Sequence, residues 1–285
     1  MNKGNLQVGV CGWGDHDELY PQGVRDRDKL SVYASHFARV EIDSSFYAIL
    51  PQKNYETWVR DTPDAFRFVV KAYQAMTGHR RGGAELEREE MFLRFAESIE
   101  PLRQAGKLHA VLFQFPPWFD CTKDHVQYLA ACRQLYPDLP LAVEFRHQSW
   151  FSENYCDKTL QFLRQLAVTH VVCDEPQVPN GSVPIVVAVT EPRLALVRFH
   201  GRNTAGWRDP GKGTNWRDVR YLYNYSEAEL QSWLPKIKQL QETADEVCIL
   251  FNNNSGGDAV NNAKRLMQLL NIEPTGLYPR QMELF

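Results

Sequence analysis

The chain has 285 residues, with 32 Lys and Arg against 35 Asp and Glu, which gives a formal net charge of -3. One (β/α)₈ barrel takes about 250 residues, so this length does not require a second domain. The charge balance lacks the basic excess that drives binding to phosphate backbones. Nucleic acid is therefore a disfavoured partner, although a local basic patch is not excluded.

Cysteine spacing and hydropathy indicate the cellular compartment in which the protein is expected. The six cysteines are scattered and form no CxxC pair or Cys/His cluster at zinc-site spacing, so we expect small core residues in a reducing compartment. The first residues lack an apolar signal core, and no stretch reaches the roughly 18 apolar residues of a membrane span. We expect a cytoplasmic protein without a membrane partner, and the oligomeric state stays open.

Short apolar runs alternate with longer segments of helical period along the whole chain. Eight runs are predicted as strands: Gln7 to Trp13, Arg39 to Asp43, Arg67 to Lys71, His109 to Gln114, Leu141 to Arg146, His170 to Asp174, Leu194 to His200 and Glu246 to Asn252. The predicted helices are Leu86 to Arg103, Lys123 to Leu135, Cys156 to Leu166, Ser226 to Glu242 and Asp258 to Leu270. This order predicts an α/β fold, a (β/α)₈ TIM barrel with a parallel eight-stranded core, as one domain over residues 1–285.

Two helix starts carry local signals, and four loops are long enough to be functional. Ser226 with Glu229 predicts a capping box, and Asp258 follows a Gly-Gly turn. The loops are Gly14 to Arg27, Gly78 to Gly83, Glu175 to Pro192 and His200 to Tyr225.

Residue parity divides each run into two faces, because side chains alternate along a strand. One face is apolar and suits the layer under the outer helices, with pairs such as Val143 and Phe145 or Val171 and Cys173. The other face turns polar toward the end of each run: Glu41, Asp43, Lys71, Gln114, Glu144, Arg146, Asp174, Arg198, His200, Asn252 and Asn254. A closed barrel gathers these groups at its carboxyl end, where such barrels have their active sites.

The alternative is a purely structural set of ion pairs. We favour a site, because so many charges on one enclosed face are costly unless they pair or serve a ligand. Candidate catalytic residues are Glu144, Asp174, His200 and Lys71. Lys71 could form a Schiff base, and the structural alternative is an ion pair with Glu41 or Asp43. Candidate substrate-binding residues are Glu41, Asp43, Gln114, Arg146, Arg198, Arg202, Trp207, Asn252 and Asn254.

The cations Lys71, Arg146, Arg198 and Arg202 favour a small anionic or phosphorylated substrate. In the loop after the seventh run, Trp207 or Trp216 could stack on a ring, or the loop could simply fold over its own aromatics. Residues 252–259 could bind a ligand at a helix amino terminus. They contain neither a P-loop nor a GxGxxG pattern, so no nucleotide cofactor is expected, and other cofactors stay unknown.

Several segments resemble the DUF72 (YecE-like) family over nearly the whole chain. They include Val8-Gly-Val-Cys-Gly-Trp, Glu41-Ile-Asp-Ser-Ser-Phe-Tyr, Phe68-Val-Val-Lys71, Leu112-Phe-Gln-Phe-Pro-Pro, Val143-Glu-Phe-Arg-His-Gln-Ser-Trp and Val197-Arg-Phe-His-Gly-Arg. The resemblance implies a TIM-type barrel. The family has no established reaction, so it supplies no catalytic residues. After the first run this chain reads Asp15-His-Asp-Glu-Leu-Tyr-Pro and departs from the common pattern.

Three functions remain open at this point. The first is an enzyme, of unknown reaction class, that acts on a small anionic or phosphorylated polar substrate by acid–base chemistry. The second is a divalent-metal-dependent hydrolase, nuclease or isomerase, because carboxylates and His are gathered on one rim. The third is a non-catalytic ligand-binding protein. Bound metal and DNA affinity separate the first two, and turnover separates the third.

Overall fold

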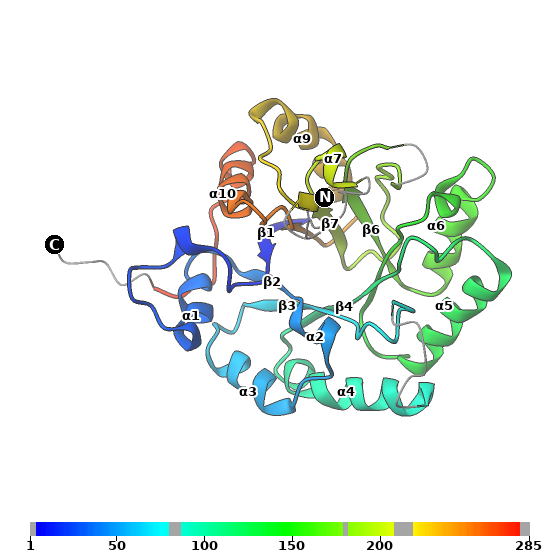
Figure 1. The fold of residues 1–285 in the computed structure, drawn as a ribbon, viewed down its shortest axis with the longest axis horizontal. Coiled ribbons are helices and arrows are strands. Elements are labelled where there is room, and N and C mark those ends of the chain that lie inside the picture. The colour runs from blue at the N-terminus through cyan, green and yellow to red at the C-terminus, as the bar shows by residue number, and fades with distance from the viewer. Residues whose placement is uncertain (1–3, 80–86, 179–181, 208–218, 280–285) are drawn as a thin grey trace.

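A computed structural model describes residues 4–79, 87–178, 182–207 and 219–279. Its centre is a closed barrel of eight parallel strands in sequence order, with β8 beside β1 (Figure 1). The strands are β1 (Asn5–Cys11), β2 (Arg39–Ile42), β3 (Arg67–Lys71), β4 (Leu108–Gln114), β5 (Leu141–Glu144), β6 (Thr169–Asp174), β7 (Ala195–Phe199) and β8 (Glu246–Phe251). All eight predicted strands and the barrel itself are confirmed, with small differences at the strand ends.

Helices surround the barrel, as Figure 1 shows. They are α1 (Lys29–Tyr33), α3 (Gln52–Arg60), α4 (Arg88–Gln104), α5 (Lys123–Leu135), α6 (Cys156–Gln165), α9 (Glu227–Gln241) and α10 (Asp258–Leu269). Two short helices, α2 (Ser44–Tyr47) and α7 (Thr204–Trp207), follow β2 and β7, and single 3₁₀ turns span Asp17–Leu19, Asp26–Asp28 and Gln148–Phe151. No helix in the described ranges is long and apolar enough to cross a membrane.

The outer layer of the core forms where strand residues meet these helices. Phe113 of β4 lies 6.1 Å, ring centre to ring centre, from Phe92 of α4, and Phe199 of β7 lies 4.8 Å from Trp233 of α9. All four rings are buried, which removes their large apolar surface from water. The predicted capping box of α9 is also confirmed, since Ser226 and Glu229 each accept from the other's backbone N–H.

Strand β6 has the opposite face assignment from the one that parity predicts. Cys173 is in register with Arg198 and Asp174 with Phe199, so Cys173 points into the barrel and Asp174 points toward the helices. The prediction was wrong here because the strand's alternating residues, Val171, Val172 and Cys173, are all apolar. Without a polar residue inside the run, the hydrophobic pattern does not fix which face is inward.

An ionic layer closes the amino-terminal end of the barrel. Glu246 accepts from Nε and Nη2 of Arg39 at 2.8 and 2.9 Å, and His109 Nε2 lies 3.1 Å from the same carboxylate. Arg39 also donates to the carbonyls of Ala38 and Ala65. Burial raises the pKa of Glu246, but its bonds to His109 and Arg39 outweigh that effect and lower the pKa to about 2.

Replacing Glu246 by Gln should reduce the free energy of unfolding at pH 7 by about 3 kcal/mol, because Arg39 loses its counter-charge. A depressed folded pKa contributes stability that is complete above the unfolded value of 4.5 and is lost as pH falls toward 2. Urea titrations should therefore show the difference between wild type and variant shrinking between about pH 5 and pH 2. The exposed Glu242→Gln control should change stability by less than about 0.5 kcal/mol at either pH, and an equally small effect of Glu246→Gln would contradict this role.

Candidate active site

The Arg198 guanidinium lies at the centre of the carboxyl end of the barrel and has no exposed surface. It binds Glu41 through Nε and Nη2 at 2.8 and 2.5 Å, and Glu144 through Nη1 at 2.5 Å. Its Nη2 also lies 3.6 Å from the sulfur of Cys11. Burial raises the pKa of Glu41 to about 7, whereas the two-pronged bond to Arg198 favours the carboxylate. Arg198 is therefore saturated by protein groups.

Glu144 of β5 is the second fully buried acid and gathers donors from four residues. Besides Arg198, it accepts from Gln114 Nε2 at 2.7 Å, forms an ion pair with Arg146 Nε at 2.6 Å and lies 3.2 Å from His200 Nε2. Burial raises its pKa, but Arg146 and then Arg198 outweigh this and hold the pKa well below its usual range. Glu144 is therefore a fixed negative charge that orients its neighbours.

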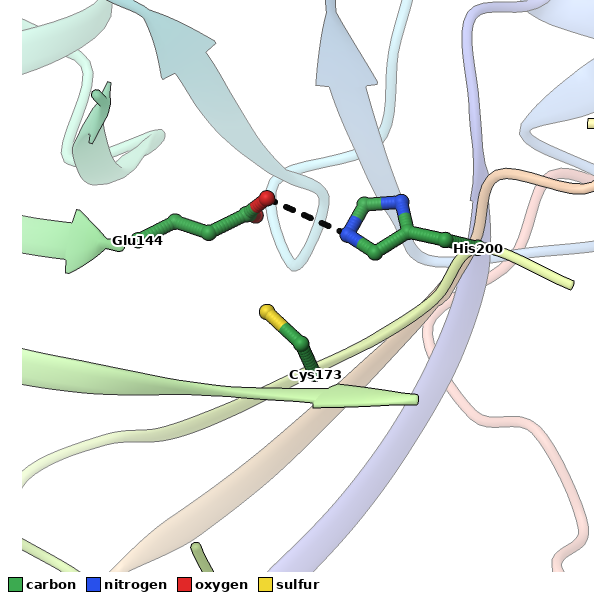
Figure 2. Close-up of side chains that lie close together, drawn as sticks. All are labelled: Glu144, Cys173 and His200. Atoms are coloured by element: carbon green, nitrogen blue, oxygen red, sulfur yellow. Dashed lines mark ion pairs between the residues drawn. The ribbon is translucent and has the colours of Figure 1, made fainter. Parts of the chain in front are cut away.

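His200 and Cys173 complete this cluster, and Figure 2 shows both side chains converging on Glu144. The Nδ1 atom of His200 lies 3.0 Å from Asn252 Nδ2, and its Nε2 faces Glu144. Burial and then the Arg146 charge lower the pKa of His200 well below its usual value, so the ring is neutral. Burial also raises the pKa of the Cys173 thiol, which therefore keeps its proton.

Two groups of side chains have the residue types of a metal site. Glu144, Cys173 and His200 form one, and Cys11, Glu41 and Asp43 form the other, each with ligand atoms within 4.8 Å of one another. In the first group, however, guanidinium nitrogens of Arg146 and Arg198 lie 3.2 and 3.4 Å from His200 Nε2. In the second, Arg198 already holds both oxygens of Glu41. The guanidiniums occupy the place of a cation, so neither group suits a divalent metal.

Arg146 lies above Glu144 and differs from Arg198 in having unused donors. Its Nε binds Glu144, its Nη1 binds Glu175 at 2.7 Å, and its Nη2 lies 3.2 Å from His200. A guanidinium has five N–H groups, and at least two of those on Arg146 have no acceptor among the described residues, so they remain for a ligand. Glu175 also accepts from the backbone N–H of Val183 at 2.7 Å, and burial raises its pKa to about 7 against the pull of Arg146.

Lys71, at the end of β3, forms an ion pair with Asp43 at 3.1 Å and lies 4.7 Å from the ring centre of Phe46. Burial lowers its pKa, but Asp43 and Glu41 outweigh burial and raise it above the ordinary value. A Schiff-base lysine needs the opposite shift. The ion-pair alternative is therefore the better description of Lys71. The side chain of Asp43 is 38% exposed. This pair is therefore the most exposed of the described ion pairs around Arg198, Glu144, Arg146 and Lys71, which together form the barrel floor.

Aromatic side chains stand beside Lys71 and Arg146. Phe46, His79 and Trp118 form a row with ring-centre spacings of 5.0 and 6.0 Å. Burial and then the cations Lys71 and Arg146 lower the pKa of His79 to about 4. Tyr221 lies 6.1 Å, ring centre to ring centre, from His200. The polar floor thus has an aromatic wall.

Two other predicted binding segments are only partly at the site. Trp207 is buried, and its ring lies between the guanidiniums of Arg146 and Arg220, at 5.5 and 3.9 Å. Trp216 lies outside the described residues. Asn252 reaches His200, whereas the carbonyl of Asn254 accepts from Gly257 in the turn that starts α10.

Asp174 and Arg202 lie apart from this cluster. Asp174 accepts from Arg202 Nε and Nη2 at 2.8 and 2.6 Å, from Tyr225 OH at 2.9 Å and from Trp233 Nε1 at 2.5 Å. Trp233 belongs to α9, so this node joins β6 and the loop after β7 to an outer helix. The expectation that Asp174 points into the site was therefore wrong, and Arg202 pairs with Asp174 and Glu229.

Sequence reasoning missed several residues that the fold brings to the site. Cys173 and Glu175 follow from the reversed face of β6, because Glu175 is the next inward residue after Cys173. The register of β6 against β7, which the sequence does not reveal, was the signal that was lacking. Tyr221, Arg220 and His79 come from loops, where alternation says nothing about direction.

Asp174→Asn should reduce the free energy of unfolding by about 3 kcal/mol, because an amide presents its own donors to the three groups that bond this buried carboxylate. Urea unfolding of the variant checks this, with exposed Asp245→Asn as the control. If Asp174→Asn stays within about 0.5 kcal/mol of wild type, Asp174 does not have this structural role.

Comparisons with known proteins agree on the family. The family model described as "Protein of unknown function DUF72" matches residues 7–283. The UPF0759 protein YunF of Bacillus subtilis (strain 168) is 51% identical over 281 residues, which cover 98% of this chain and 100% of that protein.

Solved structures extend this result to the fold. A DUF72 family protein of Enterococcus faecalis V583 is 38% identical with a TM-score of 0.90, covering 98% of this chain and 100% of that one. Another from Thermotoga maritima MSB8 is 32% identical with a TM-score of 0.80, covering 94% and 100%. A D-psicose 3-epimerase, 11% identical with a TM-score of 0.51 over 93% and 100%, shares the fold alone. The chain is a member of the DUF72 family.

Proposed function

We propose that the chain is an enzyme that acts on a small anionic polar substrate by proton transfer at the carboxyl end of its barrel. The observation that carries this proposal is Arg146, whose guanidinium is held from three sides and keeps two N–H groups for a ligand. Lys71 supplies a second, partly exposed cation on the same floor. Both are fixed before any ligand arrives, which reduces the cost of binding.

Arg198 and Arg202 do not take part in this anion site. Arg198 has no exposed surface and is saturated by Glu41 and Glu144, and Arg202 is bound to Asp174. The cations that favour an anionic substrate are therefore two of the four expected from the sequence. Arg198 acts instead through Glu144, which orients Arg146.

Glu175 is the proton carrier in this proposal. A general acid or base works best with a pKa near the operating pH, and burial raises that of Glu175 to about 7. Glu144 stays ionised beside it. Two carboxylates in one site with separated pKa values are the usual arrangement for acid–base catalysis. His200 is neutral, contacts Asn252 and Glu144 and lies beside Arg146.

The aromatic row of Phe46, His79 and Trp118 supports a ring-containing or polyol substrate rather than a bare inorganic anion. Sugar and organic-acid rings present C–H faces that pack on aromatic side chains, while their charged group reaches the cations. The substrate class that fits is a sugar phosphate or sugar acid.

The test is a panel of sugar phosphates, sugar acids, other organic acids and divalent ions, each added to the purified protein during thermal unfolding. An anion at 100 times its dissociation constant should stabilise the protein by about 2.7 kcal/mol. Lys71→Met and Arg146→Lys should each remove at least about 1 kcal/mol of that stabilisation, because Lys71→Met loses the charge and Arg146→Lys loses the planar guanidinium with its paired donors. Turnover of the stabilising compound then separates an enzyme from a binding protein.

Arg193→Met, which removes an exposed arginine paired with Glu191, is the matched control and should leave the anion effect unchanged. Stabilisation by divalent ions alone would contradict the proposal and favour the metal-dependent alternative. An anion effect that survives in both Lys71→Met and Arg146→Lys would show that the anion binds elsewhere.

Anion affinity should fall by up to about tenfold from pH 6 to pH 8, because Glu175 ionises over this range and its negative charge lies 2.7 Å from Arg146. Titration calorimetry at several pH values, with the stabilising anion from the panel, measures this slope. Glu175→Gln should flatten it. A slope that is the same in wild type and Glu175→Gln would assign the titration to another group.

A further inference from the structure

A second cavity of about 410 Å³ lies between the loops after β3 and β4 and the helices α4 and α5. Its volume is within the roughly 300–1,000 Å³ range of small-molecule sites. Ala75, Thr77 and Gly78 line it from the first loop, and Pro116, Trp118 and Phe119 from the second. Its described lining contains none of the charged residues of the barrel floor but shares Trp118 with the aromatic row, so this cavity adjoins the proposed active site and differs from it in its charged group.

The polar atoms of its aromatic lining are bonded within the protein. Tyr128 OH donates to the Met76 carbonyl at 2.6 Å, and Trp118 Nε1 donates to the Gly78 carbonyl at 3.3 Å. His125 Nδ1 is 2.9 Å from Asp120 Oδ1, and its ring stacks on Phe119 with centres 4.1 Å apart. These bonds fix the rings, so the cavity offers planar apolar faces to a ligand.

One side chain gives the cavity a charge. Arg88, the first residue of α4, is the one Lys, Arg, Asp or Glu among the described lining residues, and its guanidinium lies 5.1 Å from the ring centre of Tyr128. In the described part of the chain, no carboxylate lies within ion-pair distance of Arg88; the neighbouring Glu90 pairs with Arg94. A cation beside aromatic faces suits a ring that carries a negative group.

We propose that this cavity binds a small aromatic carboxylate, with the ring among Trp118, Phe119 and Tyr128 and the carboxylate on Arg88. Met91, buried in the first turn of α4, has a flexible side chain that adapts to the edge of the ring. The site differs in chemistry from the barrel floor, where the cations stand among carboxylates. It gives the protein a second ligand class, whose carboxylate lies on Arg88 and not on Lys71 or Arg146.

Indole-3-acetate is the probe, and neutral indole is its matched analogue without the charge. Calorimetric titration of the full-length protein should show that indole-3-acetate binds and that Arg88→Met weakens it about five- to tenfold, because an exposed charge-assisted contact is lost. Arg94→Met, on the exposed side of the same helix, should leave the affinity unchanged. Indole should bind wild type and Arg88→Met equally.

Three results would overturn the proposal. The first is an absence of binding by indole-3-acetate at millimolar concentration. The second is an affinity that is the same in Arg88→Met as in wild type. The third is loss of binding in Lys71→Met, which would place the carboxylate on the barrel floor. Arg88 is exposed, so Arg88→Met folds and each result can be read.

Discussion

The Arg198 guanidinium, enclosed by the carboxyl ends of the strands, determines how the rest of this site is built. A charge without exposed surface costs several kcal/mol of desolvation, and only close counter-charges offset that cost. Glu41 and Glu144 supply them from opposite sides of the barrel, on β2 and β5. Once Glu144 is fixed in this way, its second oxygen is available to Arg146, Gln114 and His200.

The charged side chains become progressively more exposed with distance from Arg198 toward the surface. Glu144 and His200 are fully buried, Arg146 is nearly so, and Lys71 and Asp43 reach the surface. Such an order is expected of a preorganised site, in which buried charges orient the groups that contact a ligand. The ion pair of Arg39 and Glu246 at the opposite end of the barrel is mostly buried, with side chains 7% and 16% exposed.

The sequence was sufficient for the barrel and for most of its polar end, because period-two alternation and polar strand ends are local signals. Glu41, Glu144 and Arg198 were identified in this way, and the structure joins them directly. It was insufficient for β6, where an apolar run leaves both faces equivalent until β7 fixes the register. Asp174 was misplaced for that reason, and Glu175 was missed.

The alternation of residues along the strands also does not reveal which charged side chains form ion pairs with one another. The sequence does not distinguish the cations Lys71, Arg146, Arg198 and Arg202. The fold saturates Arg198, pairs Arg202 with Asp174 outside the cluster and leaves donors on Arg146. Which cation binds a ligand depends on distances between strands that are far apart along the chain. Loop residues such as Tyr221 and His79 depend on loop conformation, for which no periodic signal exists.

We infer that the buried charges around Arg198 serve a ligand and are not needed for folding. The free energy of unfolding of the double variant Glu41→Met with Arg198→Met, which removes one buried charge of each sign, tests this inference. Glu144 keeps Arg146, Gln114 and His200 as partners in that variant. We expect stability equal to or above that of wild type, as found when buried ion pairs are replaced by apolar residues of similar volume. A loss of more than about 3 kcal/mol would contradict it and show that the cluster holds the barrel together.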